Sequence, residues 1–318
     1  IAEIVAEAFS PEEVALFEGT AEVSTYLTSL PFDHIFFTGS PEVGKLVMAA
    51  AAKNLTSVTL ELGGKSPVIV DKTANIAKAA RSIAFGKFSN NGQTCIAPDY
   101  LFVDESVKDL LIAELKSYIG RQYGLGEDAL GNGDYCQIAN SAHHGRISGL
   151  LNDALAQGGQ LITGGQIDDQ QRFIAPTLVE GMSADSRIMQ EEIFGPLMPI
   201  LTFTDLDTVL EHINAQPKPL ALYFYSSDRK AIDKVLKETS AGGTCINQTV
   251  MHFVHPNLPF GGVNNSGIGM SSGEWGFKAF SHERSVLEDK WGSTHLMHPP
   301  YTPKVKKLIK MAVSFLGR

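Results

Sequence analysis

Short runs of β-branched and aromatic residues alternate along this chain with longer stretches in which apolar residues recur at helical spacing. The short runs predict strands at residues 14–18, 34–39, 57–62, 67–71, 100–104, 160–163, 198–203 and 221–226. The periodic stretches predict helices at residues 1–9, 21–30, 42–52, 75–88, 106–119, 140–157, 206–213 and 229–238. Segments rich in Gly and Asp at 124–134 and 164–172 predict surface connections. This alternation predicts an α/β fold with a largely parallel sheet covered by helices.

Composition and charge narrow the class of protein. The chain has 318 residues, enough for one large or two ordinary domains, and 43% of them are apolar, which is ample for a packed core. A net charge of -9 disfavours nucleic acid as a partner, because nucleic acid attracts basic surfaces. The chain contains no run of about 18 apolar residues, which is the length that a membrane-spanning helix needs. The three cysteines are too few and too widely spaced for a disulfide framework or a metal site, so we expect a cytoplasmic location and no bound metal.

A glycine-containing turn follows the predicted strand at 34–39. Residues 39–45 read Gly-Ser-Pro-Glu-Val-Gly-Lys, which fits a phosphate-binding P-loop up to its last position. That last position needs a Ser or Thr hydroxyl for Mg²⁺, but here it is Leu46, which cannot bind a metal. A kinase or ATPase is therefore disfavoured, although the backbone N–H groups of the turn can still face a phosphate at a helix start.

Two other segments contain candidate catalytic groups. Cys95 ends the sequence Asn-Gly-Gln-Thr-Cys just after a predicted helix, and Glu61 begins the sequence Glu-Leu-Gly-Gly-Lys-Ser-Pro. A cysteine in a turn rich in Gly and Asn is a candidate nucleophile, since such a turn can expose the thiol and lower its pKa. Taken alone, however, a lone cysteine is equally explained as a small buried residue, and a lone glutamate as a solvated or capping carboxylate.

Taken together, these segments resemble the aldehyde dehydrogenase superfamily. The motif at Glu61 is followed 34 positions later by Cys95. Two further motifs agree, Glu-Glu-Ile-Phe-Gly-Pro at 191–196 and Leu-Pro-Phe-Gly-Gly at 258–262, and the turn at 39–45 is similar to the family's cofactor turn. The segments 34–67 and 92–100 look most like the class 3 and coniferyl-aldehyde dehydrogenase branch.

The resemblance implies that the turn binds the pyrophosphate side of NAD or NADP, in place of the usual dinucleotide fingerprint. The residues that it assigns to the cofactor are Gly19, Gly39, Ser40, Val43, Leu62, Glu192 and Phe194. In the family, the Ser40 hydroxyl bonds a phosphate, Glu192 binds the nicotinamide ribose and Phe194 packs beside the nicotinamide. For Gly19, simple packing is an equal alternative, and Glu191 is expected to be solvated or ion-paired.

The resemblance also implies a mechanism. The Cys95 thiolate attacks the aldehyde carbon to form a thiohemiacetal, which loses hydride to the nicotinamide and becomes a thioester. Glu61 then acts as the general base on the hydrolytic water, a role for which burial should raise its pKa. The implied substrate is an aromatic aldehyde, such as coniferyl aldehyde, or a medium-chain aliphatic one, and the product is the acid. A CoA-acylating relative is disfavoured, because transfer to CoA needs no such base.

The domains implied are an incomplete Rossmann-like NAD(P)-binding domain at 1–62, an α/β catalytic domain at 63–270 and a C-terminal oligomerisation segment at 271–318. The family's oxyanion-stabilising Asn and adenosine-binding Lys belong to motifs that do not occur here, so we expect the N-terminal part of the family's chain to be absent. The alternative function is therefore a truncated, non-catalytic remnant kept for its fold or oligomer contacts. The choice between NAD and NADP stays open, since the residues that decide it belong mostly to the absent part.

Other candidate side chains have plainer interpretations. Cys136 and Cys245 are expected in loops or in the core, and Lys65 is expected to serve local structure. The histidine pair at 143–144 is expected at the surface. The two histidines within 251–257 lie where the family's substrate funnel is found, so a role in lining the substrate is the alternative to a structural one.

The tail at residues 304–316 is amphipathic and basic. Its apolar face is formed by Val305, Leu308, Ile309, Ala312 and Phe315. Such a face packs against another subunit or lies on a membrane surface. Packing within a homodimer or homotetramer is favoured.

Overall fold

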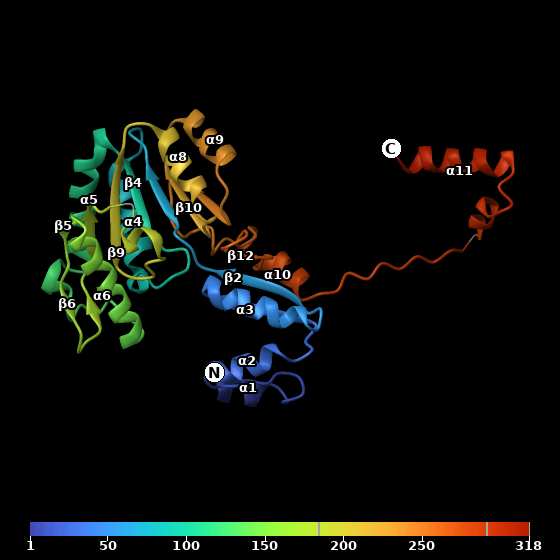
Figure 1. Cartoon of the computed structure of the whole chain (residues 1–318), viewed down its shortest axis with the longest axis horizontal. Coiled ribbons are helices and arrows are strands. Elements are labelled where there is room, and N and C mark those ends of the chain that lie inside the picture. Colours follow the sequence, from blue (N-terminus) through green and yellow to red (C-terminus); the bar gives the residue numbers. More distant parts are fainter. Residues whose placement is uncertain (184, 291, 318) are drawn as a thin grey trace. The chain divides into compact units, whose positions relative to one another are not determined.

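The computed structural model describes residues 1–183, 185–290 and 292–317. These residues form two compact units, Ile1–Phe280 and Ser281–Arg318. The first unit contains both β-sheets that matter for the site, and Figure 1 labels many of its elements.

A small sheet is formed in the described part of the chain by three strands in the order β1-β2-β12. Their bounds are His34–Gly39 for β1, Ser57–Leu62 for β2 and Gly267–Ile268 for β12. The first two strands are parallel and are connected by helix α3, Pro41–Ala52, while β12 runs antiparallel to β2. Buried Val47 of the helix packs on Leu60 and Leu62 of β2. The sequence therefore predicted this βαβ unit correctly, but not the short returning strand.

The predicted strand at 14–18 is wrong. The first elements are helices α1, Ala2–Ala8, and α2, Ala21–Thr28, and the fully described residues between them form no strand. Val14, Leu16 and Phe17 are 40%, 42% and 65% exposed. A strand needs a neighbour to satisfy its backbone N–H and C=O groups, and no described strand pairs with this segment. A composition that favours β-structure is therefore not sufficient to form a strand at residues 14–18.

The larger sheet has, among the described residues, seven strands in the order β11-β10-β3-β4-β9-β8-β5. Their bounds are β3 Pro67–Val70, β4 Tyr100–Asp104, β5 Gln160–Thr163, β8 Thr177–Glu180, β9 Leu197–Phe203, β10 Ala221–Tyr225 and β11 Gly243–Ile246. Every pairing is parallel except that of β5 with β8. The predicted α/β class with a largely parallel sheet is confirmed.

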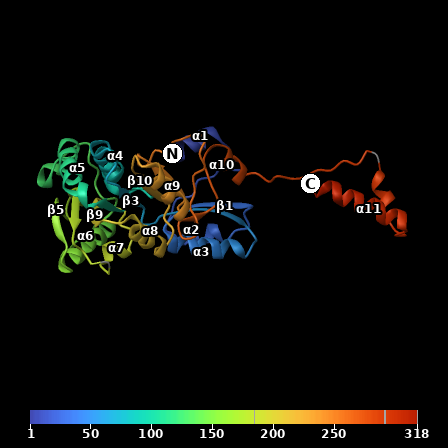
Figure 2. The same ribbon diagram turned by 90° about the horizontal axis from the view of Figure 1, so that it is seen from above.

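Helices cover both faces of this sheet. Side chains alternate along β3, so that Val68 and Val70 belong to one buried cluster and Ile69 to the other. The first cluster includes residues of α4, Ile76–Phe88, and α5, Lys108–Gln122. The second includes residues of α6, Ser141–Ala156, α8, Leu206–Ala215, and α9, Arg229–Glu238. Figure 2 shows α4 and α5 on one side of the strands and α6 on the other.

The remaining elements of the first unit are short. They are the hairpin strands β6 Ile167–Asp168 and β7 Phe173–Ile174, the helices α7 Arg187–Gln190 and α10 Gly273–Ala279, and the 3-10 turns η1 Ser89–Gly92, η2 Glu105–Val107 and η3 Gly126–Ala129. The predicted surface connection at 164–172 thus also contains strand β6, which pairs with β7.

The second unit contains the turn η4, Ser293–Met297, and helix α11, Pro303–Leu316. The Thr302 hydroxyl caps this helix by accepting a bond from Val305 N, and Pro303 occupies its first turn. The predicted amphipathic helix is confirmed, whereas its packing partner stays a prediction. No helix in the described ranges is long and apolar enough to cross a membrane.

Candidate active site

A cavity of about 1100 Å³ lies in the first unit. Its walls come from the β1–α3 turn, the Gly-Gly turn after β2, the turn at 90–95, helix α6 and the segment 190–194. Six of the predicted site residues line it: Gly39, Ser40, Glu61, Cys95, Glu192 and Phe194. The fold therefore brings together motifs that are far apart in the sequence.

The turn that carries Cys95 is held by side-chain amides. After α4 the backbone passes through three left-handed residues, Asn90, Asn91 and Gly92, a conformation that Asn and Gly tolerate best. The buried Asn91 amide donates to the Cys136 carbonyl at 2.6 Å. The Gln93 amide oxygen accepts from Ala139 N at 2.8 Å. The Asn-Gly-Gln sequence thus serves to fix the turn against the segment before α6.

Cys95 is half-buried, and its thiol is not acidified. Burial raises the pKa of Cys95 to about 11, and the negative charges of Glu61 and Glu192 add to this effect. The sequence-based expectation of a lowered pKa is therefore wrong for this structure. The main physical reason is burial, which disfavours the charged thiolate, and the negative charges of the two carboxylates disfavour it further.

Glu61 lies in β2 and is only 8% exposed. It pairs with Gly267 of β12, and its carboxylate accepts a hydrogen bond from the Ser271 hydroxyl. Burial raises the pKa of Glu61, and the Ser271 hydrogen bond acts in the opposite direction. The expected effect of burial on this carboxyl group is thus confirmed.

The turn between β1 and α3 forms a helix start that opens into the cavity. Ser40 is the N-cap of α3, and its hydroxyl accepts from Val43 N at 3.4 Å. The Glu42 carboxylate accepts bonds from its own backbone N–H and from the Ser40 hydroxyl, which lowers the pKa of Glu42. The helix start therefore already stabilises a negative charge.

Three residues predicted to bind the cofactor do not line this cavity. Leu62 is buried beneath α3, where a Cβ added to Gly44 would lie 2.6 Å from its Cδ2. Val43 is 45% exposed on the same helix. Gly19 precedes α2, and a Cβ at this position would lie 2.4 Å from Val23 Cγ2. Their contribution to cofactor binding stays a prediction.

The segment that carries Glu192 lines the same cavity as Cys95. The Glu192 carboxylate packs on Gly63, where an added Cβ would lie 2.1 Å from Glu192 Oε2. Burial and the nearby Asp99 charge raise the pKa of Glu192 to about 7. The Glu191 carboxylate instead pairs with Arg187 at 2.8 Å, as expected for an ion-paired neighbour.

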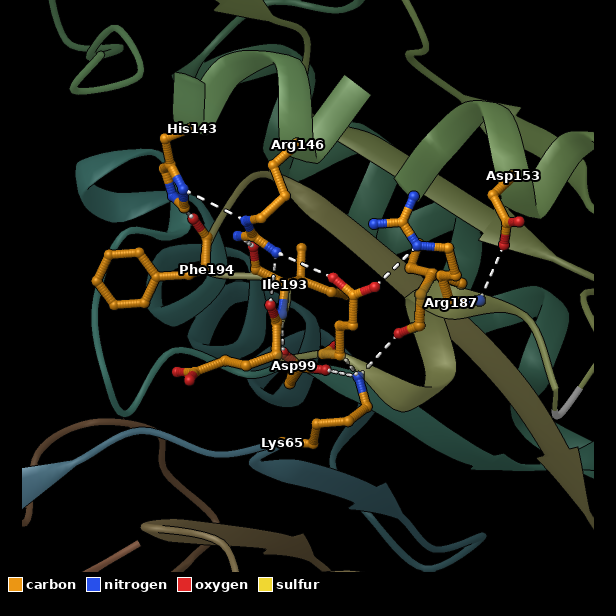
Figure 3. Close-up of polar contacts among 11 residues, drawn as sticks. Lys65, Asp99, His143, Arg146, Asp153, Arg187, Ile193 and Phe194 are labelled. Carbon is orange, nitrogen blue, oxygen red and sulfur yellow. Dashed lines mark hydrogen bonds and ion pairs between the residues drawn. The ribbon is translucent and has the colours of Figure 1, made fainter. Parts of the chain in front are cut away.

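A buried ion pair supports this segment from below (Figure 3). Lys65 Nζ forms a salt bridge with Asp99, and the two side chains are 11% and 3% exposed. Lys65 also donates to the Glu191 carbonyl at 2.9 Å, while Asp99 accepts from Ile193 N at 2.8 Å. The expected structural role of Lys65 is thus the positioning of the segment 191–194.

The family model described as "Aldehyde dehydrogenase family" matches residues 1–286. The chain belongs to this family. The dimeric NADP-preferring aldehyde dehydrogenase of Rattus norvegicus is 45% identical over 92% of this chain. The probable coniferyl aldehyde dehydrogenase of Pseudomonas aeruginosa is 41% identical over 96% of it. A solved structure titled as the substrate-bound state of Staphylococcus aureus AldH matches with a TM-score of 0.92 and 45% identity over 98% of the chain.

These aldehyde dehydrogenases confirm the predicted class 3 and coniferyl-aldehyde branch. The chain spans 63% and 64% of the length of the rat and Pseudomonas relatives, and 67% of the Staphylococcus chain.

The histidines of α6 differ from the sequence-based expectation. His143 lines the cavity, and His144 is buried with its Nε2 atom 3.1 Å from the Phe173 carbonyl oxygen. The expectation that both lie at the surface is therefore wrong. The signal was present in the helical period, because His144 lies three and seven positions before the buried residues Ile147 and Leu151.

The remaining cysteines and histidines lie outside the cavity lining. Cys136 is exposed and Cys245 is buried, as expected for loop and core residues. His252 is also buried, with its Nδ1 atom 3.2 Å from Cys245 Sγ, and His255 is exposed. Across the described residues, no group of three or more His, Cys, Asp or Glu side chains could hold a metal ion.

Proposed function

We propose that the protein oxidises an aldehyde to its carboxylic acid with NAD or NADP. This proposal rests on one observation, which is that Cys95, Glu61 and Glu192 line the same cavity. The substrate class that we propose is an aromatic aldehyde, such as coniferyl aldehyde, or a medium-chain aliphatic one. The similarity to the Pseudomonas coniferyl aldehyde dehydrogenase supports the aromatic class.

In the proposed reaction, the Cys95 sulfur loses its proton and bonds to the aldehyde carbon, and the carbonyl oxygen becomes an oxyanion. The backbone N–H of Cys95 is one donor available to that oxyanion. Glu61 lines the same cavity and is the base proposed for the thiol proton, since burial raises its pKa and so makes its carboxylate a stronger proton acceptor. When bound, NAD(P) accepts the hydride that the tetrahedral carbon releases.

The resulting thioester on Cys95 must then be hydrolysed. After Glu61 has released the thiol proton to solvent, it takes a proton from a water molecule. The hydroxide adds to the thioester carbon and displaces the Cys95 sulfur as a thiolate, which gives the acid. Burial raises the pKa of Glu61, which makes its carboxylate a stronger base towards the proton of this water. The Ser271 hydroxyl fixes the orientation of the carboxylate.

Several residues of this chain fit the cofactor. Ser40 and the N–H groups at the start of α3 suit a phosphate, because this helix start already binds the Glu42 carboxylate. Glu192 can accept hydrogen bonds from ribose hydroxyls, and Phe194 offers an aromatic face beside it. These groups do not discriminate between NAD and NADP.

The test uses the full natural polypeptide and its Cys95→Ala variant. The polypeptide should reduce NAD⁺ or NADP⁺ with coniferyl aldehyde or benzaldehyde, and the variant should show no turnover. Full turnover in Cys95→Ala would refute the mechanism. A native polypeptide that binds cofactor but oxidises neither aromatic nor medium-chain aldehydes would instead favour the non-catalytic alternative.

We also propose a homodimer or homotetramer in the cytoplasm. The name of the rat relative describes a dimer. The described cysteines are all free thiols, which suits a reducing compartment.

A further inference from the structure

Side chains of α6 bind the backbone of the segment that carries Glu192 and Phe194 (Figure 3). Arg146 donates to the Glu192 carbonyl at 3.0 Å and to the Ile193 carbonyl at 2.6 Å. The His143 Nε2 atom lies 2.9 Å from the Phe194 carbonyl oxygen. Three successive carbonyl groups are therefore bonded by two side chains from one helix, although this segment belongs to no helix or strand.

The two side chains also support each other. They lie three positions apart on α6 and so share a face of the helix. Because a carbonyl oxygen only accepts, His143 must carry its proton on Nε2, and Nδ1 is then free to accept from Arg146 Nε at 3.5 Å. Burial lowers the pKa of His143, which favours this neutral form. The histidine thus orients the guanidinium as well as the Phe194 carbonyl.

The bound backbone is in an unusual conformation. Phe194 has φ of 46°, in the left-handed region that residues other than glycine rarely adopt. Such a conformation persists where the surroundings over-determine it. Here the His143 ring also contacts the Phe194 ring edge-on, with centroids 5.7 Å apart. The hydrogen bonds and this ring contact together define the direction in which Phe194 faces the cavity.

We propose that His143 and Arg146 are positioning residues for the nicotinamide end of the cofactor. They hold the backbone of residues 192–194 in place. The Glu192 carboxylate can then bind the ribose and the Phe194 ring can pack beside the nicotinamide, so that the nicotinamide lies close to Cys95. This role rests on the proposed function. It concerns cofactor placement, so loss of either side chain should affect cofactor binding far more than the reactivity of the Cys95 sulfur.

The test compares His143→Ala and Arg146→Ala in the full natural polypeptide. The Kd for NADPH and NADH is measured by fluorescence, kcat and KM by aldehyde oxidation, and the rate of Cys95 alkylation by iodoacetamide with peptide mass spectrometry. We expect kcat/KM for the cofactor to fall by about 10- to 100-fold, as for small misplacements of reacting groups. The Kd should rise, whereas Cys95 alkylation should stay within about twofold, because it depends on the thiol environment.

Conservative variants and a matched control separate positioning from general stability. His143→Gln keeps an N–H donor and should recover most of the cofactor affinity, while Arg146→Lys should recover part of it. Arg187→Ala removes a neighbouring arginine that contacts the Glu191 carboxylate but none of these three carbonyl groups, and it should leave all measurements unchanged.

Three results would overturn the inference. They are an unchanged cofactor Kd in both alanine variants, a loss of Cys95 alkylation equal to the loss of oxidation, and an Arg187→Ala variant that behaves like Arg146→Ala. None of these refutes the proposed function, which depends instead on the Cys95→Ala result.

Discussion

At the scale of single residues, the surroundings of Cys95 disfavour the thiolate, which is the reactive form of its side chain. Its raised pKa follows from burial and from two neighbouring carboxylates, so the thiol is mostly protonated at neutral pH. The pKa of Cys95 falls, and the thiolate is populated more, when Glu61 or Glu192 is neutralised or when a positive charge lies near the sulfur. The site thus links the reactivity of the sulfur to the charge state of Glu61 and Glu192.

This link predicts how Cys95 alkylation depends on pH. The rate with iodoacetamide should rise about tenfold per pH unit between pH 7 and pH 10, because only the thiolate reacts. Glu192→Gln removes one negative charge, lowers the pKa of Cys95 and should speed alkylation at pH 8. Peptide mass spectrometry distinguishes Cys95 from the exposed Cys136, which serves as an internal control. An identical rate in Glu192→Gln would contradict the electrostatic explanation.

Glu192 itself should make cofactor binding dependent on pH. Its pKa of about 7 means that the carboxylate, the form that accepts hydrogen bonds from ribose hydroxyls, is lost as the pH falls through 7. The Kd for NADH or NADPH, measured by fluorescence, should therefore rise by up to about tenfold per pH unit below 7. Glu192→Gln should remove this dependence, whereas Glu191→Gln, at an exposed ion pair, should keep it. A flat profile in the native protein would refute this role.

At the scale of elements, the turn before Cys95 depends on the absence of a side chain at Gly92. This residue has φ of 70°, and an added Cβ would lie 2.3 Å from the Gly195 carbonyl oxygen. At this point the turn therefore faces the backbone of the segment after Phe194. A side chain here cannot be accommodated by a rotamer change, because the obstacle is a main-chain atom.

Gly92→Ala should lower the free energy of unfolding by about 2–4 kcal/mol, since both the backbone conformation and the contact are unfavourable. Gly131→Ala is the matched control, because Gly131 also has a positive φ, 85°, but no atom within 4 Å of the added Cβ. The control should cost only about 1 kcal/mol. Urea denaturation measures both values. Equal losses would mean that the Gly195 contact is unimportant.

The accuracy of sequence prediction also varied by element. Strands β3 and β10 were predicted almost to the residue, because a short continuous apolar run marks a strand that is buried on both faces. Helix α9 was predicted equally well, because its helical period marks one buried face. The two-residue strand β12 gave no such pattern, and it exists only because β2 lies beside it. The segment 14–18 had the opposite problem, since its composition favours a strand that no neighbour stabilises.

At the scale of the whole molecule, motif residues were easier to find than the residues that support them. Cys95 and Glu61 belong to motifs with fixed spacing, and the fold brings them to one cavity. Ser271, which bonds Glu61, lies 210 positions later in the chain, and no local pattern marks it. His143 and Arg146 were missed for the same reason, because their function lies in contacts with a distant segment.

The last element, α11, should contribute to the oligomer through its apolar face. The helix contains Lys304, Lys306, Lys307 and Lys310 and no acidic residue, and Leu308 is among its partly buried positions. Leu308→Asp should shift the proposed oligomer towards monomer in sedimentation-velocity ultracentrifugation, because a charge cannot be buried in an apolar contact without a large cost. Ser314→Asp, at an exposed position, introduces the same charge and should leave the mass unchanged. The opposite outcome is an unchanged mass in Leu308→Asp together with binding of the native protein to anionic vesicles. The basic face and the apolar face would then act together at a lipid surface instead of between subunits.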